Sequence, residues 1–263
     1  MKLTTRLAWA AIVTASLTAC SASDPPDMTV GWPPERLYSE ASEELSRSSW
    51  TEAIKLLEKL ESRHPFTRWA QQALLSSAYA HYRSDERILA LAALDRFQKL
   101  YPNHAAMDYA LYLRGLVNFN QQQGLLANLG GQDLSERDLE AARLSFAAFT
   151  DLIARYPDSR YAADARDRLA YLRNAMASGE VAVARFYFRR GAYVASANRS
   201  QRVIATYQDA PAVLEALQIL RDSYDRLGLK DLRDDTDRVI ALNKPSAPSA
   251  SAGTERRWWQ VFR

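Results

Sequence analysis

The chain has 263 residues, of which 48% are hydrophobic, so it has material for a sizeable core. Its formal net charge of +3 argues against a dedicated nucleic-acid-binding protein, which usually carries a strong basic excess. Only nine glycines are present, whereas the good helix formers alanine, leucine, arginine and glutamine are common, which predicts an all-α fold. The single cysteine excludes an internal disulfide and a multi-cysteine metal site.

The first 19 residues have the layout of a signal peptide. Lys2 and Arg6 form a short positive region, and an apolar stretch follows at residues 7–17. That stretch is too short to span a bilayer comfortably but has the length of a signal-peptide core. An ordinary N-terminal helix is the alternative, which the polarity order disfavours.

The tetrapeptide "LTAC", which ends at Cys20, resembles the lipobox of bacterial lipoproteins. Small residues let a peptidase approach the backbone, and the thiol can be alkylated to a diacylglycerol thioether. The resemblance implies cleavage before Cys20 and a covalent diacylglycerol and N-acyl lipid on it, which together give stable anchoring to the membrane. Ser21 stands where Asp would be an inner-membrane retention signal in enteric-type lipoproteins, so we expect the outer membrane. Residues 20–35, rich in Ser, Pro and Asp, are predicted to be an extended tether.

A step of 37 residues recurs through the body of the chain. Pro65 and Pro102 are one step apart, and so are the members of three columns of apolar or small residues. The columns are Leu37, Leu74 and Leu111; Ala41, Ala78 and Gly115; and Leu45, Tyr82 and Phe119. Their spacing of four residues makes a stripe on one helix face. The pattern resembles the tetratricopeptide repeat and predicts an all-α, tetratricopeptide-type helical-hairpin solenoid of about five repeats over residues 36–243.

The later repeats depart from the period. An insertion fits residues 121–138, where Gly124, Gly130 and Gly131 indicate a loop, and Phe149 and Leu152 then resume the columns of Leu57 and Leu60. After Pro157 the register weakens. We expect separate helices at 163–175 and 180–190, a second helix of a fourth unit at 192–207, and a fifth pair at 212–227 and 229–242.

Residues 244–263 are predicted to be a disordered linker followed by the amphipathic tail "RRWWQVFR", which contains Trp258 and Trp259. Its basic and aromatic composition suits a groove on a partner or a membrane interface. A segment this short would be disordered on its own, so three interpretations remain open.

No catalytic constellation stands out. His64, His81 and His104 lack metal-ligand spacing, and the chain contains neither a phosphate-binding loop nor a nucleophile elbow. We therefore expect no enzymatic activity, no metal, and no cofactor besides the lipid on Cys20.

Four stretches resemble the BamD family of outer-membrane lipoproteins, also known as ComL or YfiO. They are "HPFTRWAQQALLSSAYAHYRSDERILALAALDRFQKLYPNH", "MDYALYLRGL", "RYPDSRYAADARDRLAYLR" and "RGAYVASANR". The resemblance implies a lipid-anchored binding component of the machinery that inserts β-barrel proteins, on the periplasmic face of the outer membrane. Its N-terminal repeats would engage unfolded barrel proteins. Its C-terminal repeats would hold a POTRA domain of BamA and the other Bam lipoproteins.

Candidate residues for substrate binding lie in the first two and a half units. Phe66, Tyr79 and Tyr109 could accept the aromatic residue that ends many barrel strands, and Arg96 and Lys99 could pair with its carboxylate. Core packing is the alternative for Phe66 and Tyr79 and is favoured for the nearby Tyr82. A solvated helix face is the alternative for the two basic residues.

The resemblance places Arg190, Asn198 and Arg199 in the segment that faces the partner. Two other functions stay open. A periplasmic repeat lipoprotein could serve cell-wall synthesis or division instead, and a lipid-anchored enzyme would need a convergent set of acid, base or nucleophile.

Overall fold

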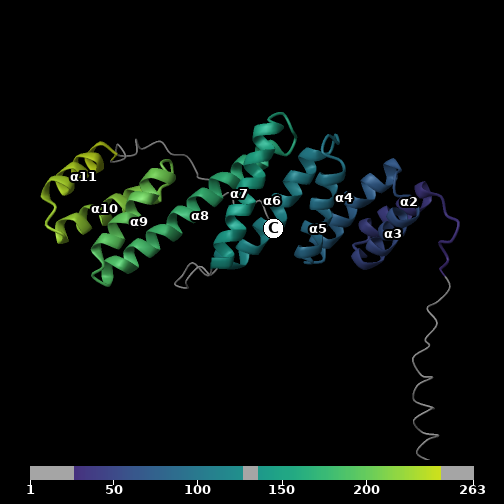
Figure 1. Cartoon of the computed structure of the whole chain (residues 1–263), viewed down its shortest axis with the longest axis horizontal. Coiled ribbons are helices and arrows are strands. Elements are labelled where there is room, and N and C mark those ends of the chain that lie inside the picture. Colours follow the sequence, from purple (N-terminus) through teal and green to yellow (C-terminus); the bar gives the residue numbers. More distant parts are fainter. Residues whose placement is uncertain (1–26, 127–135, 244–263) are drawn as a thin grey trace, which may run out of the picture. The chain divides into compact units, whose positions relative to one another are not determined.

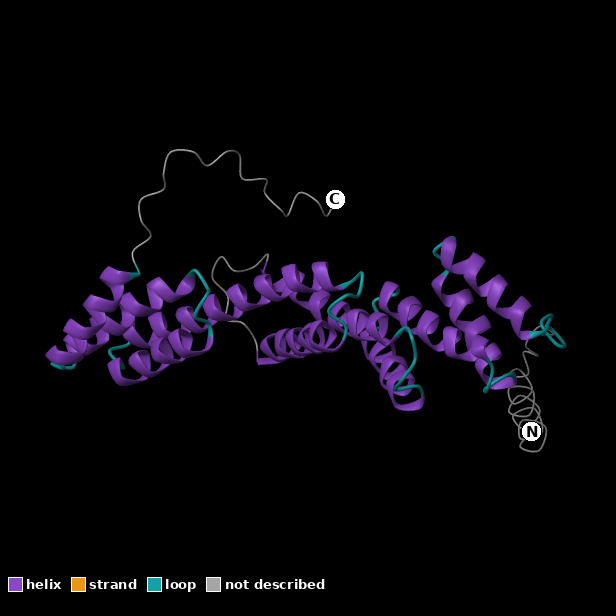
Figure 2. Cartoon of the chain, turned by 90° about the horizontal axis from the view of Figure 1, so that it is seen from above, coloured by secondary structure: helices purple, strands orange, loops and turns teal. Residues whose placement is uncertain are grey.

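The computed structural model describes residues 27–126 and 136–243 (Figure 1). Within these ranges all regular structure is helical and strands are absent (Figure 2). The helices are α2 (Pro34–Ser46), α3 (Trp50–Arg63), α4 (Arg68–Arg83), α5 (Arg87–Leu100), α6 (Met107–Leu126), α7 (Glu136–Arg155), α8 (Ala162–Arg189), α9 (Tyr193–Thr206), α10 (Ala212–Arg226) and α11 (Lys230–Leu242). The predicted signal peptide, Cys20, and the predicted linker and tail at 244–263 lie outside the described residues.

Consecutive helices form five pairs. Helix α2 packs on α3, α6 on α7, α8 on α9 and α10 on α11, while α4 and α5 contribute Leu75, Ala78, Ala90 and Leu94 to one core cluster. The prediction of an all-α fold of tetratricopeptide-type helical hairpins with about five repeats is therefore confirmed over the described residues.

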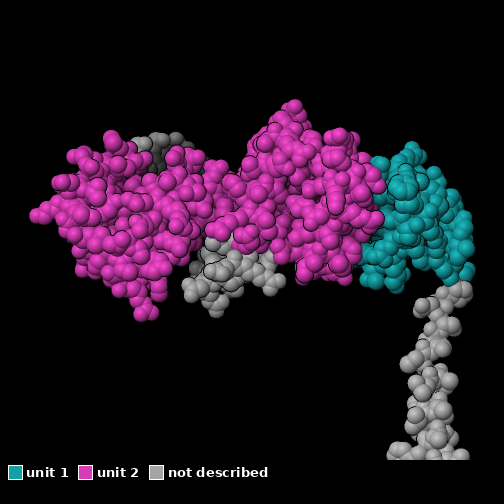
Figure 3. Space-filling view, in the orientation of Figure 1, with its two compact units in different colours: residues 1–73 teal, residues 74–263 magenta. Residues whose placement is uncertain are grey.

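The chain divides into two compact units, with the boundary inside α4 between Ala73 and Leu74 (Figure 3). The core of unit 1 contains Leu37 and Ala41 of α2, Leu57 and Leu60 of α3, and the start of α4. Trp32 and Trp69 are partly buried against it. Apolar residues spaced three and four apart on each helix build this core, as the repeat columns require.

The larger core of unit 2 uses the same columns. Leu111, Gly115 and Phe119 of α6 and Phe149 and Leu152 of α7 are all buried. Across both units, the column residues identified from the sequence are buried except Leu45 and Tyr82, which are partly buried. The 37-residue columns therefore mark the core.

Helix α8 corrects the prediction of two helices at 163–175 and 180–190, because it is continuous over 28 residues. The interval from Tyr156 to Tyr207, which occupy equivalent helix ends, is 51 residues, 14 more than the period. Fourteen residues make about four helical turns, so the extension keeps the same face buried. The first half of α8 adds Leu172 to the larger core, and the second half adds Val181 to another.

Two further boundaries differ from the predictions. Gly124 lies inside α6 rather than in a loop, while Gly130 and Gly131 lie outside the described residues. The end of the expected tether is attached to unit 1: the Asp27 carboxylate forms ion pairs with Lys59 (2.8 Å) and Arg63 of α3. A turn follows at residues 28–31, and α2 begins at Pro34.

The turns inside four hairpins share one geometry. Ser48, Asp85, Gly191 and Gly228 all have positive φ, at 62°, 61°, 76° and 74°. The first two are 37 residues apart and so are the last two. This left-handed residue reverses the chain so that each second helix packs back on the first.

Candidate binding site

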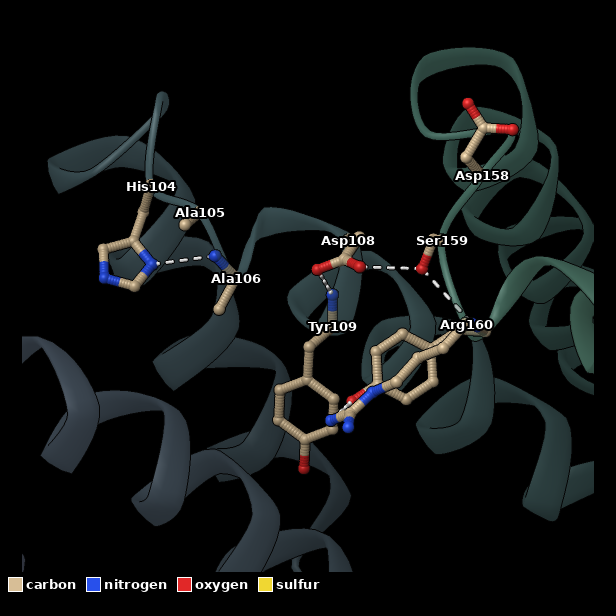
Figure 4. A pocket seen from close by; sticks show the side chains of 9 residues that line it. His104, Ala105, Ala106, Asp108, Tyr109, Asp158, Ser159 and Arg160 are labelled. Carbon is tan, nitrogen blue, oxygen red and sulfur yellow. Dashed lines mark hydrogen bonds between the residues drawn. The ribbon is translucent and has the colours of Figure 1, made fainter.

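A pocket of about 770 Å³ lies in unit 2 where two loops between repeats meet (Figure 4). One wall is the loop from α5 to α6 and the first turn of α6, and the other is the loop from α7 to α8. The residues that line it are His104, Ala105, Ala106, Asp108, Tyr109, Asp158, Ser159, Arg160 and Tyr161. It is shallow and broadly open to solvent, unlike an enclosed cavity for a small molecule.

The two walls are tied together by the carboxylate of Asp108. Its Oδ2 accepts a hydrogen bond from Ser159 Oγ at 2.7 Å, and its Oδ1 accepts one from the backbone N–H of Tyr109 at 2.7 Å. Because both oxygens are used internally, Asp108 fixes the shape of the pocket. The backbone N–H of Tyr161 donates a hydrogen bond to Ser159 Oγ, which connects Tyr161 to the same network.

Stacked tyrosines form the floor beside the pocket. The ring of Tyr161 lies 4.7 Å from that of Tyr112, nearly parallel, and 5.6 Å from that of Tyr109. The Tyr112 hydroxyl donates to Asp164 at 2.7 Å. Burial, together with this hydrogen bond, raises the pKa of Tyr112 to about 12, and burial also raises the pKa of Tyr109. Both phenols are therefore neutral near pH 7, and the single hydroxyl hydrogen of Tyr112 is already donated to Asp164.

Arg160 supplies a cation over this aromatic floor. Its guanidinium lies 4.8 Å from the centroid of the Tyr161 ring and donates a hydrogen bond to the Tyr161 hydroxyl. Figure 4 shows the side chains of Arg160 and Tyr109 pointing toward each other, while Asp158 and His104 point away. A guanidinium beside partly buried tyrosine rings can bind a carboxylate and an aromatic side chain at once.

The structure brings together only some of the predicted substrate-binding residues. Tyr109 lines the pocket. Tyr79 of α4 is partly buried against the larger core, and its hydroxyl accepts a hydrogen bond from Arg83 at 2.8 Å. Tyr82 packs against the same core, as favoured from the sequence. Phe66 belongs to unit 1, where its ring is 97% exposed between α3 and α4, which excludes the core-packing alternative for it.

Arg96 and Lys99 lie on the exposed face of α5 and are not among the residues that line the pocket. The pocket instead obtains its cation from Arg160, which was not predicted from the sequence. The signal for it is present: "DSRYAAD" supplies an arginine and a tyrosine in the loop after Pro157, the turn position that ends each repeat.

The predicted partner-facing residues lie around the hairpin of α8 and α9. Arg199 Nη1 bonds to Glu180 Oε2 at 2.8 Å, and the side chain of Glu180 is only 9% exposed. Arg190 directly follows α8, and its guanidinium lies 5.3 Å from the centroid of the Phe186 ring; Phe186 is itself 45% exposed. Asn198 is exposed on α9. These residues offer cations and an exposed ring to a protein surface.

Neither a membrane span nor a metal cluster is found in the part of the chain that the structure describes. No helix within residues 27–126 and 136–243 combines the length and the apolar character needed to cross a bilayer. The same residues contain no group of three or more metal-ligating side chains.

The fold and the pocket define a helical-hairpin repeat protein with surfaces suited to protein or peptide ligands. Residues 31–239 match the model of the YfiO family, described as outer membrane lipoprotein. The chain belongs to this family.

Curated relatives cover nearly the whole chain. The outer membrane protein assembly factor BamD of Neisseria meningitidis serogroup A is 46% identical over 254 residues, which span 94% of this chain and 95% of the relative. The protein of the same name from Vibrio cholerae is 40% identical over 227 residues, which span 86% of this chain and 93% of the relative. A solved structure of kinesin light chain TPR-like repeats from Podosopora anserina has a TM-score of 0.33 at 12% identity, covering 80% of this chain and 94% of that one, a likeness too weak to bear on the fold.

Proposed function

We propose that this protein is a lipid-anchored, non-enzymatic scaffold of the outer-membrane β-barrel assembly machinery, held by Cys20 on the periplasmic face of the outer membrane. The observation that carries the proposal is the near full-length match to relatives named outer membrane protein assembly factor BamD. The family's description as outer membrane lipoprotein supports the anchor and the location.

Unfolded barrel proteins are the proposed substrates, and the pocket at Arg160 and Tyr161 is their proposed binding site. A barrel strand that ends in an aromatic residue and a carboxylate matches the guanidinium and the tyrosine rings. Tyr109 and Tyr79 contribute from α6 and α4, and the exposed ring of Phe66 offers a further contact in unit 1. Arg96 and Lys99 of α5 remain proposed contacts for a longer segment.

The hairpin of α8 and α9 is the proposed site for a POTRA domain of BamA and for the other Bam lipoproteins. Arg199 is oriented by a buried carboxylate, so little side-chain entropy is lost when it meets a partner. Arg190 and Asn198, which are both exposed, are further proposed contacts.

Depletion of the protein tests the proposed function. We expect folded outer-membrane barrels to decrease and unfolded barrel proteins to accumulate in the periplasm, measured by heat-modifiable mobility of the barrels on gels. Normal barrel levels combined with a defect in cell-wall synthesis or division would favour a scaffold of that machinery instead.

The substrate site has its own test, a photo-crosslinking peptide that ends in Phe with a free carboxylate. Arg160→Gln should reduce crosslinking about tenfold, the loss expected for one charge-assisted hydrogen bond. The matched control is Arg143→Gln, an exposed arginine of α7 that does not line the pocket, which should leave crosslinking unchanged. Amidation of the peptide terminus should abolish the difference. Equal crosslinking by both variants would assign the site elsewhere.

A further inference from the structure

The outer face of α11 carries an apolar stripe that the repeat pattern does not require. Leu232, Val239 and Leu242 are 45%, 41% and 85% exposed. One period earlier, the equivalent positions of α9 hold Ala195, Arg202 and Ala205. The stripe thus consists of large apolar residues where the neighbouring repeat has small or charged ones. Single exposed leucines are common on protein surfaces, whereas a row of large apolar side chains on one helix face marks an interaction site.

The stripe is not the face on which a further repeat would pack. In α9 the face that meets the next hairpin includes Ala197 and Ile204, which contact Leu220 and Tyr224 of α10. The equivalent positions of α11 are Asp234 and Ala241, both exposed, so no further repeat packs on this face within the described residues. A different occupant has to account for the apolar stripe.

The residues that follow α11 have the composition to cover it. Only Asn243 separates Leu242 from residues 244–263. Within these, Arg256–Arg263 reads "RRWWQVFR", with four large apolar side chains and three arginines. Helix α11 carries four aspartates, and three of them already pair with arginines: Asp234 with Arg233, Asp235 with Arg238, and Asp237 with Arg221. Asp231 lies next to Leu232 and forms no ion pair with the residues that the structure describes.

The chain length allows the segment to return to the helix. Twelve residues, 244–255, separate α11 from Arg256, and an extended chain of that length spans about 40 Å. Helix α11 has 13 residues and is therefore about 20 Å long. A covalently attached segment with this reach has an effective concentration in the millimolar range, well above that of a partner in solution.

We propose that the C-terminal segment Arg256–Arg263 folds back and docks on the stripe Leu232, Val239 and Leu242 of α11. The tryptophans, Val261 and Phe262 cover the apolar residues, and an arginine of the segment faces Asp231. The segment thereby closes the C-terminal end of the repeat array. This docking goes beyond the proposed function and does not depend on it.

Site-directed crosslinking in the full chain tests the proposal. Cys20→Ser removes the only cysteine, after which Val239→Cys and Val261→Cys are introduced together and treated with a short bismaleimide. We expect an intramolecular crosslink whose yield is independent of protein concentration. The matched control replaces Val239→Cys with Arg202→Cys, the exposed equivalent on α9, and should give at least tenfold less.

Further arms separate the other occupants. Leu232→Asp with Leu242→Asp, added to the cysteine pair, should reduce the yield at least fivefold. Equal yields at positions 239 and 202 would overturn the proposal, as would crosslinks found only between two copies. It would also be overturned if the 239–261 yield rose above the control only when phosphatidylglycerol vesicles were added, since the segment would then bind lipid.

Discussion

Gly115 of α6 lies directly against the ring of Phe149 of α7. A Cβ atom built on Gly115 would be 2.3 Å from Cε1 of that ring, far inside van der Waals contact. The approach is also marked by Ser145 Oγ, which donates to the Gly115 carbonyl at 2.9 Å. In the first two repeats the same pair of columns holds Ala41 with Leu57 and Ala78 with Leu94. In the third repeat the small member of the pair is smaller still, Gly instead of Ala, and the large member is larger, Phe instead of Leu.

Gly115→Ala should lower the free energy of unfolding by about 1–3 kcal/mol, because the added methyl group overpacks a buried contact. Phe149→Leu alone leaves a cavity and should cost about 1 kcal/mol or more. The double variant restores the combination of the first two repeats and should recover at least half of the summed loss in urea denaturation followed by circular dichroism. Strictly additive losses would show that the two residues are not coupled.

The hairpin turns offer a second prediction, on backbone conformation. A Cβ at Gly191 or Gly228 would meet no atom within 4 Å, so Gly191→Ala should be destabilising through its positive φ alone, by about 1 kcal/mol. Ser48 adopts the same conformation without being glycine. Ser48→Gly relieves that strain but raises the conformational entropy of the unfolded chain. The free energy of unfolding should therefore rise by no more than about 0.5 kcal/mol. Thermal unfolding of both variants measures the contrast, and a loss at Ser48→Gly would contradict it.

The core of this fold was predictable because burial repeats at a fixed step. Leu37, Leu74 and Leu111 each fill the same place, so three weak signals reinforce one another. The continuous helix α8 was missed for a local reason. Ser178 and Gly179, poor helix formers, lie at its middle and suggest a break, yet α8 continues because residues on both sides are buried in tertiary contacts.

The pocket was only partly predictable, since its walls come from two loops about 50 residues apart. Tyr109 stood out as an aromatic within a recognisable motif. Arg160 and Tyr161 follow a proline turn and have no periodic partner, so nothing in the linear sequence places them opposite Tyr109. The hydrogen bond from Ser159 to Asp108 that sets this juxtaposition becomes visible only in three dimensions.

Acidification should release the segment before α2 from unit 1. Hydrogen bonds from Lys59 and Thr29, together with Arg63, hold the pKa of Asp27 well below its usual range. A depressed folded-state pKa contributes stability that is present above the unfolded value of about 4 and is lost as the pH falls below it. Asp27→Asn should remove this contribution at pH 7. Faster amide exchange at residues 28–33 in the variant, and in the native protein only below about pH 4, measures the effect.

The matched control for Asp27 is Glu52→Gln, which breaks an exposed ion pair with Lys55 on the same helix, α3. Such a local surface pair contributes little, so exchange at residues 28–33 should stay unchanged. Equal acceleration by both variants would mean that general charge balance, rather than the contact of Asp27 with α3, holds the segment.

The ion pair between Arg199 and Glu180 leads to the last prediction. Replacing Arg199 with Glu would set two carboxylates side by side at a buried position, so any loss of partner binding could come from damaged folding. Arg199→Ala is cleaner: it leaves the Glu180 carboxylate, only 9% exposed, without its partner and should cost about 1–3 kcal/mol. The double variant Glu180→Gln with Arg199→Ala removes the buried charge as well and should be more stable than Arg199→Ala alone in urea denaturation.

Co-purification with BamA then separates the structural role of Arg199 from a role in partner binding. If Arg199 contacts the partner, both variants lose BamA to the same extent although their stabilities differ. Recovery of BamA in the double variant would assign Arg199 a purely structural role within the hairpin of α8 and α9.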